Sequence, residues 1–317
     1  MKESKYIWMD GELVKWSEAK VHVLTHTLHY GNAVFEGTRA YQTEDGLAIF
    51  KLDEHCKRLY NSAKITAIKP NITLEEVRLA HIELLKANEF NSGANIYIRP
   101  LIYLGYGQMG VHHVNAPVHT MIAAWEWGAY LGDEGLENGI KVCTSSITRN
   151  PNRSTFGKAK AAANYLNSQM AKYEAIEAGF EEALMLDENG FAAEGTGECL
   201  FIVRDGVLIS PPNDNSLESI TQATVIKLAK EFNIKVERRN ITRDEIYICD
   251  EAFFTGTAAE VTPINSLDHR EIGNGSRGEM TKKLQSAYFD VVYGRDKDYK
   301  SDLTYINRKS VYKQGGY

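Results

Sequence analysis

The chain has 317 residues, of which 43% are hydrophobic and 25% charged, a composition typical of a soluble globular protein with one large or two ordinary domains. The formal net charge of −6 excludes nucleic acid as a main partner, because contacts to phosphates need clustered Lys and Arg. No apolar run approaches the roughly 20 residues needed to span a bilayer, which excludes a membrane-spanning helix.

The first part of the chain predicts hairpins, then two helices, then two long strands. Asp-Gly pairs at 10–11 and 45–46 are typical hairpin turns, and each lies between runs with strand composition. Asp53 is the expected N-cap of a helix that ends near Ile65, and Thr73 opens a second helix. The expected strands are Tyr6–Met9, Glu12–Lys15, Ala33–Tyr41, Leu47–Leu52, Asn95–Leu104 and His119–Trp125.

A glycine-rich stretch at 128–139 is the expected boundary between two domains. We predict a small domain over 1–130, a linker over 131–140 and a large domain over 141–317. The large domain is expected to contain the strands Ile140–Ile147, Ala183–Asp187, Cys199–Val203, Val207–Ser210 and Ala252–Thr255, and the helices Ala161–Ala178, Ser219–Phe232 and Gly278–Tyr293. Because hairpins and helices are mixed, the predicted class is α+β, with an interdomain cleft suited to a cofactor.

Two segments of the large domain suggest pyridoxal phosphate chemistry. Lys160 lies among small residues, which leaves room for a flat cofactor against a lysine that forms a Schiff base. Glu194 lies in a glycine-rich turn and could be the anionic partner that the pyridine nitrogen needs. Tyr165, five positions beyond Lys160, could reach the phenolic oxygen of the cofactor. Lys158 competes with Lys160 on spacing alone, and each of these residues could equally be an ordinary solvated or half-buried side chain.

The sequence offers three candidates for binding a phosphate group. Leu217–Thr221 leads directly into a helix, whose free N–H groups can hold a dianion. Thr255–Glu260 follows a strand and could form an anion-binding nest, and Arg58 could add a guanidinium. On local sequence alone, Ser219 is equally a plain N-cap and Arg58 equally an arginine that faces solvent.

Other motifs are weaker and are interpreted as structural. His22 and His26 share a helical spacing, but no acidic ligand or His-Glu-x-x-His pattern accompanies them, so we expect no metal site. Gly195-Thr196-Gly197 lacks the full dinucleotide-binding pattern. The scattered cysteines form no Cys-x-x-Cys and are expected as buried thiols of a cytoplasmic protein.

Six segments, taken in chain order, resemble those of the branched-chain amino acid aminotransferases, which belong to the fold-type IV class of pyridoxal phosphate enzymes. They are His29–Arg39, Tyr97–Leu101, Trp127–Gly132, Lys160–Tyr165, Glu194–Glu198 and Thr255–Glu260. The resemblance covers nearly the whole chain and favours Lys160 over Lys158. It implies a two-domain fold similar to D-amino acid aminotransferase, with pyridoxal 5'-phosphate in the interdomain cleft.

The resemblance also implies roles at the cofactor. Lys160 would form the Schiff base and move a proton between the substrate Cα and the cofactor C4′. Glu194 would pair with the pyridine nitrogen, and Tyr165 would bond the phenolic oxygen. The phosphate would be held by Arg58, the backbone at Ile220 and Thr221, and Thr257.

For the substrate, the resemblance implies that its carboxylate binds Tyr97 and the backbone of Thr257 and Ala258. The apolar side-chain pocket would be walled by Tyr30, Phe35, Gly37, Trp127 and Tyr130. Arg39 and Arg99 are the candidates for the distal carboxylate of glutamate, since a buried carboxylate needs a partner.

The chain departs from the family pattern at the expected phosphate loop. The family often has Leu-Pro-Gly-Ile-Thr-Arg where this chain has Leu217-Glu218-Ser219-Ile220-Thr221-Gln222. Glu218 must therefore point away from the phosphate, because like charges would weaken binding. Ala162-Ala163 replaces a usual Gly pair, and the redox Cys-x-x-Cys of some animal members is absent.

The expected activity is ping-pong transfer of the amino group between L-leucine, L-isoleucine or L-valine and 2-oxoglutarate. Rivals with the same cofactor and fold are D-amino acid aminotransferase and aminodeoxychorismate lyase, and a rival of another class is a pyridoxal phosphate-binding protein without turnover. The expected partners are small amino acids and 2-oxo acids. We expect a homo-oligomer, either a dimer or a hexamer.

Overall fold

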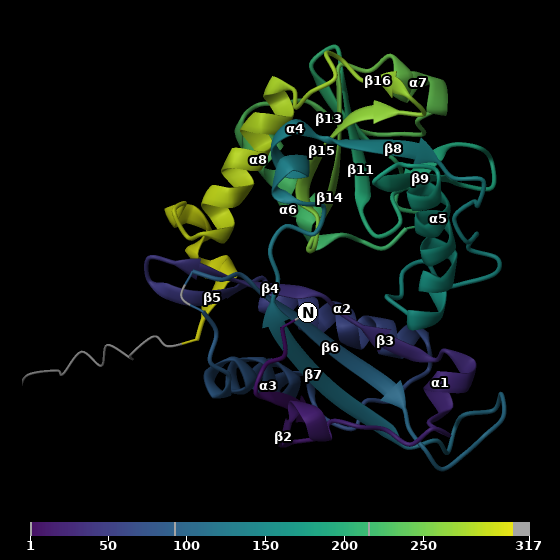
Figure 1. Ribbon diagram of the computed structural model, residues 1–317, viewed down its shortest axis with the longest axis vertical. Helices are drawn as coiled ribbons and strands as arrows, with labels where there is room; N and C mark the ends of the chain where they lie inside the picture. Colours follow the sequence, from purple (N-terminus) through teal and green to yellow (C-terminus); the bar gives the residue numbers. More distant parts are fainter. Residues whose placement is uncertain (1, 92, 215, 307–317) are drawn as a thin grey trace, which may run out of the picture.

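The computed structural model describes residues 2–91, 93–214 and 216–306. It consists of two α+β domains, each built on one sheet, which lie one above the other in Figure 1. Among the described residues, none of the helices combines the length and the apolar character needed to cross a membrane.

The first domain contains an antiparallel sheet covered on one face by two helices. The strand order is β17-β5-β4-β6-β7-β1-β2, and β3 pairs with β6. The strands are β1 (Tyr6–Met9), β2 (Glu12–Lys15), β3 (Ala33–Phe35), β4 (Thr38–Thr43), β5 (Gly46–Phe50), β6 (Ile96–Leu104), β7 (Val118–Glu126) and β17 (Leu303–Tyr305). The helices are η1 (Trp16–Glu18), α1 (His26–Tyr30), α2 (Leu52–Ile65) and α3 (Leu74–Ala87), of which α2 and α3 pack on the sheet.

The second domain contains a mixed sheet with the order β10-β9-β8-β15-β14-β11-β12-β13, and β16 pairs with β15. Its strands are β8 (Ile140–Thr144), β9 (Glu182–Leu186), β10 (Ala192–Glu194), β11 (Cys199–Arg204), β12 (Val207–Ser210), β13 (Val236–Arg238), β14 (Glu251–Gly256), β15 (Glu260–Leu267) and β16 (Arg270–Glu271). Its helices are α4 (Asp133–Asn138), η2 (Ala162–Asn164), α5 (Tyr165–Glu177), α6 (Ile220–Glu231), α7 (Arg243–Tyr247), α8 (Glu279–Val292) and η3 (Lys297–Asp302).

Local signals placed most element starts correctly. Thr73 and Glu76 form the capping box of α3, with both reciprocal hydrogen bonds present. Ser219 caps α6 by accepting from the Gln222 N–H. The expected N-cap Asp53 lies inside α2 instead, because Lys51 takes the N-cap position with a left-handed backbone (φ +49°). The expected strand Ala33–Tyr41 is interrupted at 36–37, so β3 and β4 are separate strands.

The structure differs from the predicted domain boundaries in two places. The expected linker over 131–140 contains α4, which packs on β15 of the second domain. The segment predicted as the large domain also contributes a strand to the first domain, because β17 pairs with β5. Sequence patterns missed both features, since α4 is short and acidic and β17 has only three residues.

The segment around Lys160 joins the two domains. Ala159 and Ala161 pack in the core of the first domain although the chain continues into α5 of the second. The Lys160 N–H donates to Ser62 Oγ on α2 at 2.9 Å, and its carbonyl accepts from the Phe35 N–H on β3 at 3.0 Å. Ala159 and Ala161 are both buried at this connection, where the interior is close-packed.

Candidate active site

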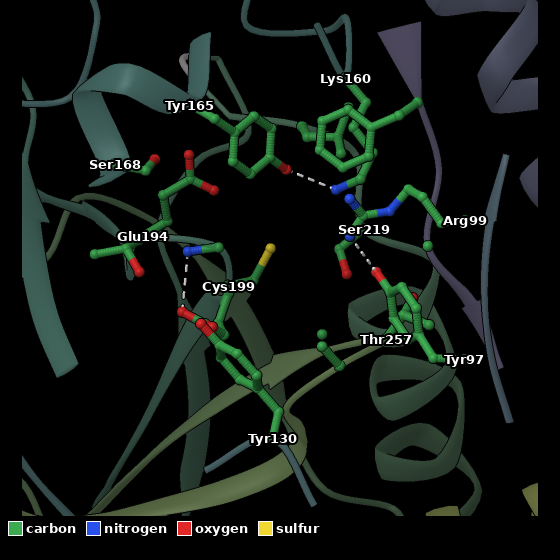
Figure 2. Close-up of a pocket in the computed structure, with 18 of the residues that line it drawn as sticks. Tyr97, Arg99, Tyr130, Lys160, Tyr165, Ser168, Glu194, Cys199, Ser219 and Thr257 are labelled. Atoms are coloured by element: carbon green, nitrogen blue, oxygen red, sulfur yellow. Dashed lines mark hydrogen bonds between the residues drawn. The ribbon is translucent and has the colours of Figure 1, made fainter. Parts of the chain in front are cut away.

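A cavity of about 450 Å³ lies between the two domains, within the size range of small-molecule sites. It collects residues that lie far apart in the sequence, and ten of its side chains are labelled in Figure 2. From the first domain and the connection, the predicted residues that line it are Phe35, Gly37, Arg58, Tyr97, Arg99, Trp127 and Tyr130. From the second domain they are Lys160, Tyr165, Glu194, Thr257 and Ala258.

The amine of Lys160 is held beside a tyrosine hydroxyl inside the cavity. Its Nζ donates to the Tyr165 hydroxyl at 2.7 Å (Figure 2) and lies 5.1 Å from the centre of the Phe35 ring. Burial alone would lower the pKa of Lys160, but Tyr165 and Glu36 reverse this and raise it. The amine is therefore a cation in these surroundings and must lose a proton before it can act as a nucleophile.

Lys158 has different surroundings from Lys160. Its Nζ donates to the Asn213 carbonyl at 2.6 Å and lies 3.3 Å from Glu218 Oε1. The Glu218 side chain is 74% exposed, so this carboxylate is turned to solvent. Of the two competing lysines, the structure brings Lys160 into the cavity and leaves Lys158 at an adjoining surface pocket.

Glu194 is positioned by a buried arginine that the sequence reasoning missed. Arg149 Nε donates to Glu194 Oε1, and both side chains are almost fully buried. Burial would lower the pKa of Arg149, but the Glu194 carboxylate more than compensates and raises it. The pair places the Glu194 carboxyl at the cavity lining, in a position suited to hold a protonated ring nitrogen.

One end of the cavity is suited to an anion. Arg58, Ser219 and Thr257 all line it, and Ser219 caps α6. The first N–H groups of a helix have no acceptor within it, and the helix dipole adds partial positive charge. Ile220 and Thr221 are the first residues of α6 and supply these N–H groups. Among the described residues, Ser219 lines the cavity, whereas Ile220 and Thr221 do not.

Arg58 is fixed by Glu36, a carboxylate absent from the predicted site. Arg58 Nε donates to Glu36 Oε1 at 2.5 Å, and Nη2 donates to Oε2 at 2.8 Å. His55 Nδ1 lies 2.8 Å from the same Oε2. Burial would raise the pKa of Glu36, but Arg58 and His55 together hold it well below its ordinary value.

A second group of glutamates includes Glu198, which lines the cavity, and its neighbour Glu182. Glu182 accepts from Lys172 Nζ at 2.7 Å and from Thr196 Oγ1 at 2.8 Å. Glu198 is buried beside it and accepts from the Gly197 N–H at 3.0 Å. Burial, followed by the charge of Glu182, raises the pKa of Glu198 to about 8. Glu198 is therefore protonated at neutral pH, and the group carries less negative charge than its sequence indicates.

The remaining wall is aromatic with one cation. Arg99 Nη2 donates to the Tyr97 hydroxyl at 3.1 Å (Figure 2), and the guanidinium lies 4.6 Å from the centre of the Phe35 ring. Gly37 is required here, because a Cβ on it would lie 2.0 Å from the Tyr97 hydroxyl. Arg99 Nε is buried and has no partner within the described part of the chain, so this cation can still receive an acceptor.

Two predicted substrate residues lie outside the cavity. Arg39 is buried beside Glu260, with Nη1 3.3 Å from Oε1, and its Nη2 donates to the Gly128 carbonyl at 2.6 Å. Its guanidinium therefore links Gly128 of the interdomain connection to Glu260 of β15. Tyr30 is 43% exposed at the end of α1, and its hydroxyl accepts from the Gly110 N–H at 3.1 Å.

The missed residues share one sequence feature. Each is a charged residue inside or close to a predicted strand: Glu36 lies inside Ala33–Tyr41, Arg149 lies two positions after Ile140–Ile147, and Glu198 directly precedes Cys199–Val203. Each is buried in the structure, where a charge needs a partner or must be neutralised. Glu36 and Glu198 also lie inside segments on which the resemblance rests, so a charged residue within a family motif was the available signal.

Comparison with known proteins identifies the class to which this site belongs. Residues 33–267 match the family described as amino-transferase class IV. The chain is 50% identical over 289 residues to the branched-chain-amino-acid aminotransferase of Pseudomonas aeruginosa, covering 91% of this chain and 93% of that protein. It is 42% identical over 309 residues to that of Escherichia coli K12, covering 97% and 99%.

A solved structure agrees with these sequence relatives. The branched-chain amino acid aminotransferase of Thermobaculum terrenum, in its PLP-bound holo-form, has a TM-score of 0.89 and 38% identity, covering 97% of this chain and all of that one. The chain belongs to the class IV amino-transferase family. The resemblance found in the sequence, and the fold-type IV architecture that it implied, are thereby confirmed.

Proposed function

We propose that this chain is a branched-chain-amino-acid transaminase, which uses pyridoxal 5'-phosphate to exchange amino groups between L-leucine, L-isoleucine or L-valine and 2-oxoglutarate. The observation that carries the proposal is the meeting of three groups in one cavity: the Lys160 amine, the Arg149-held carboxylate of Glu194, and the anion-suited end at Arg58 and Ser219. The relatives named above support the choice of branched-chain substrates.

The cavity fits the cofactor in size and in chemistry. Its volume of about 450 Å³ accommodates a small phosphorylated ring together with an amino acid. Glu194 would pair with the ring nitrogen and Tyr165 with the phenolic oxygen, while Arg58, Thr257 and the α6 N–H groups of Ile220 and Thr221 would hold the phosphate. When bound, the cofactor supplies an electron sink for negative charge at the substrate Cα.

The chain's own residues supply the proton transfers. Once neutral and with the cofactor bound, Lys160 Nζ would act as the base that accepts the proton from the substrate Cα and as the acid that returns it at C4′. The Tyr165 hydroxyl, 2.7 Å away, accepts a hydrogen bond from that amine and fixes its position. Arg149 orients the Glu194 carboxyl through the hydrogen bond from its Nε, so this group needs no reorganisation during the reaction.

The substrate-binding wall is suited to both an apolar and an acidic side chain. Phe35, Trp127 and Tyr130 provide an apolar surface for leucine, isoleucine or valine. Tyr97 and the backbone of Thr257 and Ala258 would hold the α-carboxylate. For glutamate, the distal carboxylate would bind Arg99, the one of the two predicted arginines that lines the cavity. Arg39 is not proposed for this role, because its guanidinium is already paired.

We further propose that the protein is a cytoplasmic homo-oligomer. Large apolar side chains are exposed around α1 and in the loop after β6, namely Val21, Val23, Leu24, Leu28, Tyr30, Tyr106, Met109, Val111 and Val114. A second copy of the chain would cover such a patch. The four buried free cysteines suit a reducing compartment. Sedimentation velocity tests the assembly, and a monomer at micromolar concentration would contradict it.

Isotope transfer tests the proposed reaction. The holoenzyme is incubated with 15N-labelled L-leucine, L-isoleucine or L-valine and with 2-oxoglutarate, and glutamate is analysed by mass spectrometry. We expect 15N-glutamate from each L-amino acid and none from D-leucine. Transfer from D-amino acids alone would indicate a D-amino acid aminotransferase. Absence of any transfer would favour a lyase or a cofactor-binding protein without turnover.

A further inference from the structure

We infer that Glu36 is a positioning residue for the cofactor phosphate, because it fixes the guanidinium of Arg58 where that side chain lines the cavity. The inference rests on the proposed function, in which Arg58 binds the phosphate. It adds to that function a buried carboxylate from the turn between β3 and β4, which itself lies behind the cavity wall.

The contact between the two side chains is a two-point one. Arg58 Nε and Nη2 each donate to a different oxygen of Glu36, at 2.5 and 2.8 Å. Such a fork fixes the plane and direction of the guanidinium as well as its distance. A third bond, from Nη1 to the Glu218 carbonyl at 2.7 Å, ties Arg58 to the chain just before α6.

The guanidinium still has donors for a ligand. An arginine has five N–H donors, and three of them are used by Glu36 and Glu218. One N–H on each terminal nitrogen is left, on a side chain that lines the same cavity as Ser219 and Thr257. Glu36 therefore holds Arg58 while leaving donors that match phosphate oxygens.

Glu36 is itself held by the first domain. His55 Nδ1 lies 2.8 Å from Oε2, and the Gly37 N–H donates to the same oxygen at 3.3 Å. Burial lowers the pKa of His55, so the imidazole is neutral at neutral pH and can donate a hydrogen bond without adding charge. The carboxylate is thus anchored by α2 and the β3–β4 turn, and it transmits that rigidity to Arg58.

An alternative position for Arg58 lies close by. A second pocket of about 340 Å³ adjoins the cavity and is lined by Arg58, Lys64, Lys158 and Glu218. The exposed Glu218 carboxylate in this pocket could attract a guanidinium that Glu36 no longer holds. Two effects then compete when Glu36 is altered: loss of orientation weakens phosphate binding, whereas loss of a nearby negative charge strengthens it. The fork geometry favours orientation as the larger effect.

Cofactor affinity with and without the phosphate separates these effects. The cofactor is removed from the purified holoenzyme, and pyridoxal phosphate and pyridoxal are titrated by absorbance into wild type, Glu36→Asp, Glu36→Gln and Arg58→Ala. Glu36→Asp keeps the negative charge but shortens the side chain, which disrupts the two-point contact with Arg58. We expect both Glu36 variants to bind pyridoxal phosphate about tenfold more weakly, the scale on which outer partners of a ligand act, with little change for pyridoxal. Glu75→Asp, an exposed glutamate on α3, is the matched control.

The outcomes distinguish the inference from the proposed function. In the double variant Glu36→Asp/Arg58→Ala, no further phosphate-specific loss is expected beyond that of Arg58→Ala alone. The inference is overturned if the Glu36 variants weaken pyridoxal as much as pyridoxal phosphate, leave both unchanged, or bind pyridoxal phosphate more tightly. If Arg58→Ala itself fails to discriminate the two ligands, the proposed role of Arg58 is wrong, and the inference falls with it.

Discussion

Glu36 in the first domain and Glu198 in the second are both buried beside the same cavity, yet their surroundings drive their ionisation in opposite directions. Glu36 faces Arg58 and His55, and its pKa is held well below the ordinary value even though burial acts to raise it. Glu198 has glutamate neighbours instead, so burial and the charge of Glu182 act together and raise its pKa to about 8.

The comparison shows that the neighbours of a buried carboxylate decide its charge. Glu260 is an intermediate case, and Glu194 differs from Glu198 in its partner. Glu194 shares the region of Glu198 but has Arg149 as a partner. Glu260 has Arg39 at 3.3 Å, yet burial still raises its pKa. Beside the cavity, the first domain thus holds Glu36 between an arginine and a histidine, whereas the second domain holds a protonated Glu198 near the Arg149-paired Glu194.

The largest effect is expected at Lys160, the amine whose pKa is raised by Tyr165 and by Glu36. Lys160→Ala removes both the Schiff-base amine and the proton carrier, so we expect leucine transamination to fall by about 10⁴-fold or more. Steady-state assays measure the loss. Lys158→Ala is the matched control and should retain activity, since its amine lies outside the cavity. An inactive Lys158→Ala with an active Lys160→Ala would reverse the assignment.

The second largest effect is expected at Glu194, the Arg149-paired acid of the second domain. Glu194→Gln removes the anion that pairs with the ring nitrogen, so removal of the Cα proton should slow by about 10²-fold. Stopped-flow decay of the cofactor absorbance with L-leucine and Cα-deuterated L-leucine measures that step. The cofactor should stay bound. Glu188→Gln, on an exposed glutamate paired with Arg153, is the control. A normal rate in Glu194→Gln would remove Glu194 from its proposed role.

The neutral acid Glu198 predicts a pH dependence of stability. Between the ordinary glutamate pKa of 4.5 and about 8, the folded state keeps a proton that the unfolded state releases. Rising pH therefore destabilises the fold through this group, by about 1.4 kcal/mol per pH unit within that window.

Glu198→Gln should remove this dependence. Denaturant unfolding of the holoenzyme is measured at pH 5, 6, 7 and 8. The free energy of unfolding of the variant should increase relative to that of wild type as pH rises. Glu75→Gln controls for the loss of one exposed carboxylate. Parallel stability curves for Glu198→Gln and wild type would show that Glu198 is already ionised and would remove the contrast with Glu36.

The smallest effect is expected at Arg39, which joins Gly128 to Glu260. Arg39→Lys keeps the charge but loses the bond to the Gly128 carbonyl, so the nearby wall at Trp127 and Tyr130 becomes less fixed. We expect KM for L-leucine and for glutamate to rise together by about threefold, the scale of one hydrogen bond. A rise confined to glutamate would instead place Arg39 at the distal carboxylate, as the sequence resemblance first implied.

Much of the site could be predicted because its motifs are local. Lys160, Tyr165 and Glu194 lie in short segments whose small neighbours indicate a flat ligand, and they meet in the cavity. Ser219 and Thr73 were predictable from the chemistry of capping, which involves only a few successive residues.

The rest depended on contacts between distant parts of the chain. Glu36 meets Arg58 across 22 positions, and Arg149 meets Glu194 across 45. Arg39 was predicted at the substrate because its motif adjoins the pocket, but its strand directs it to Glu260, more than 200 positions away. Such pairings follow from the sheet order and from the docking of the two domains, neither of which a local pattern encodes.

The most direct test of the account is the absorbance of the bound cofactor before and after L-leucine, and again after 2-oxoglutarate. The account predicts that L-leucine shifts the band, that D-leucine leaves it unchanged, and that 2-oxoglutarate restores it. That sequence of changes would demonstrate the cofactor, the stereochemistry and both half-reactions in one sample. A band that does not respond to L-leucine, or no band after reconstitution with pyridoxal phosphate, would contradict the proposed transamination.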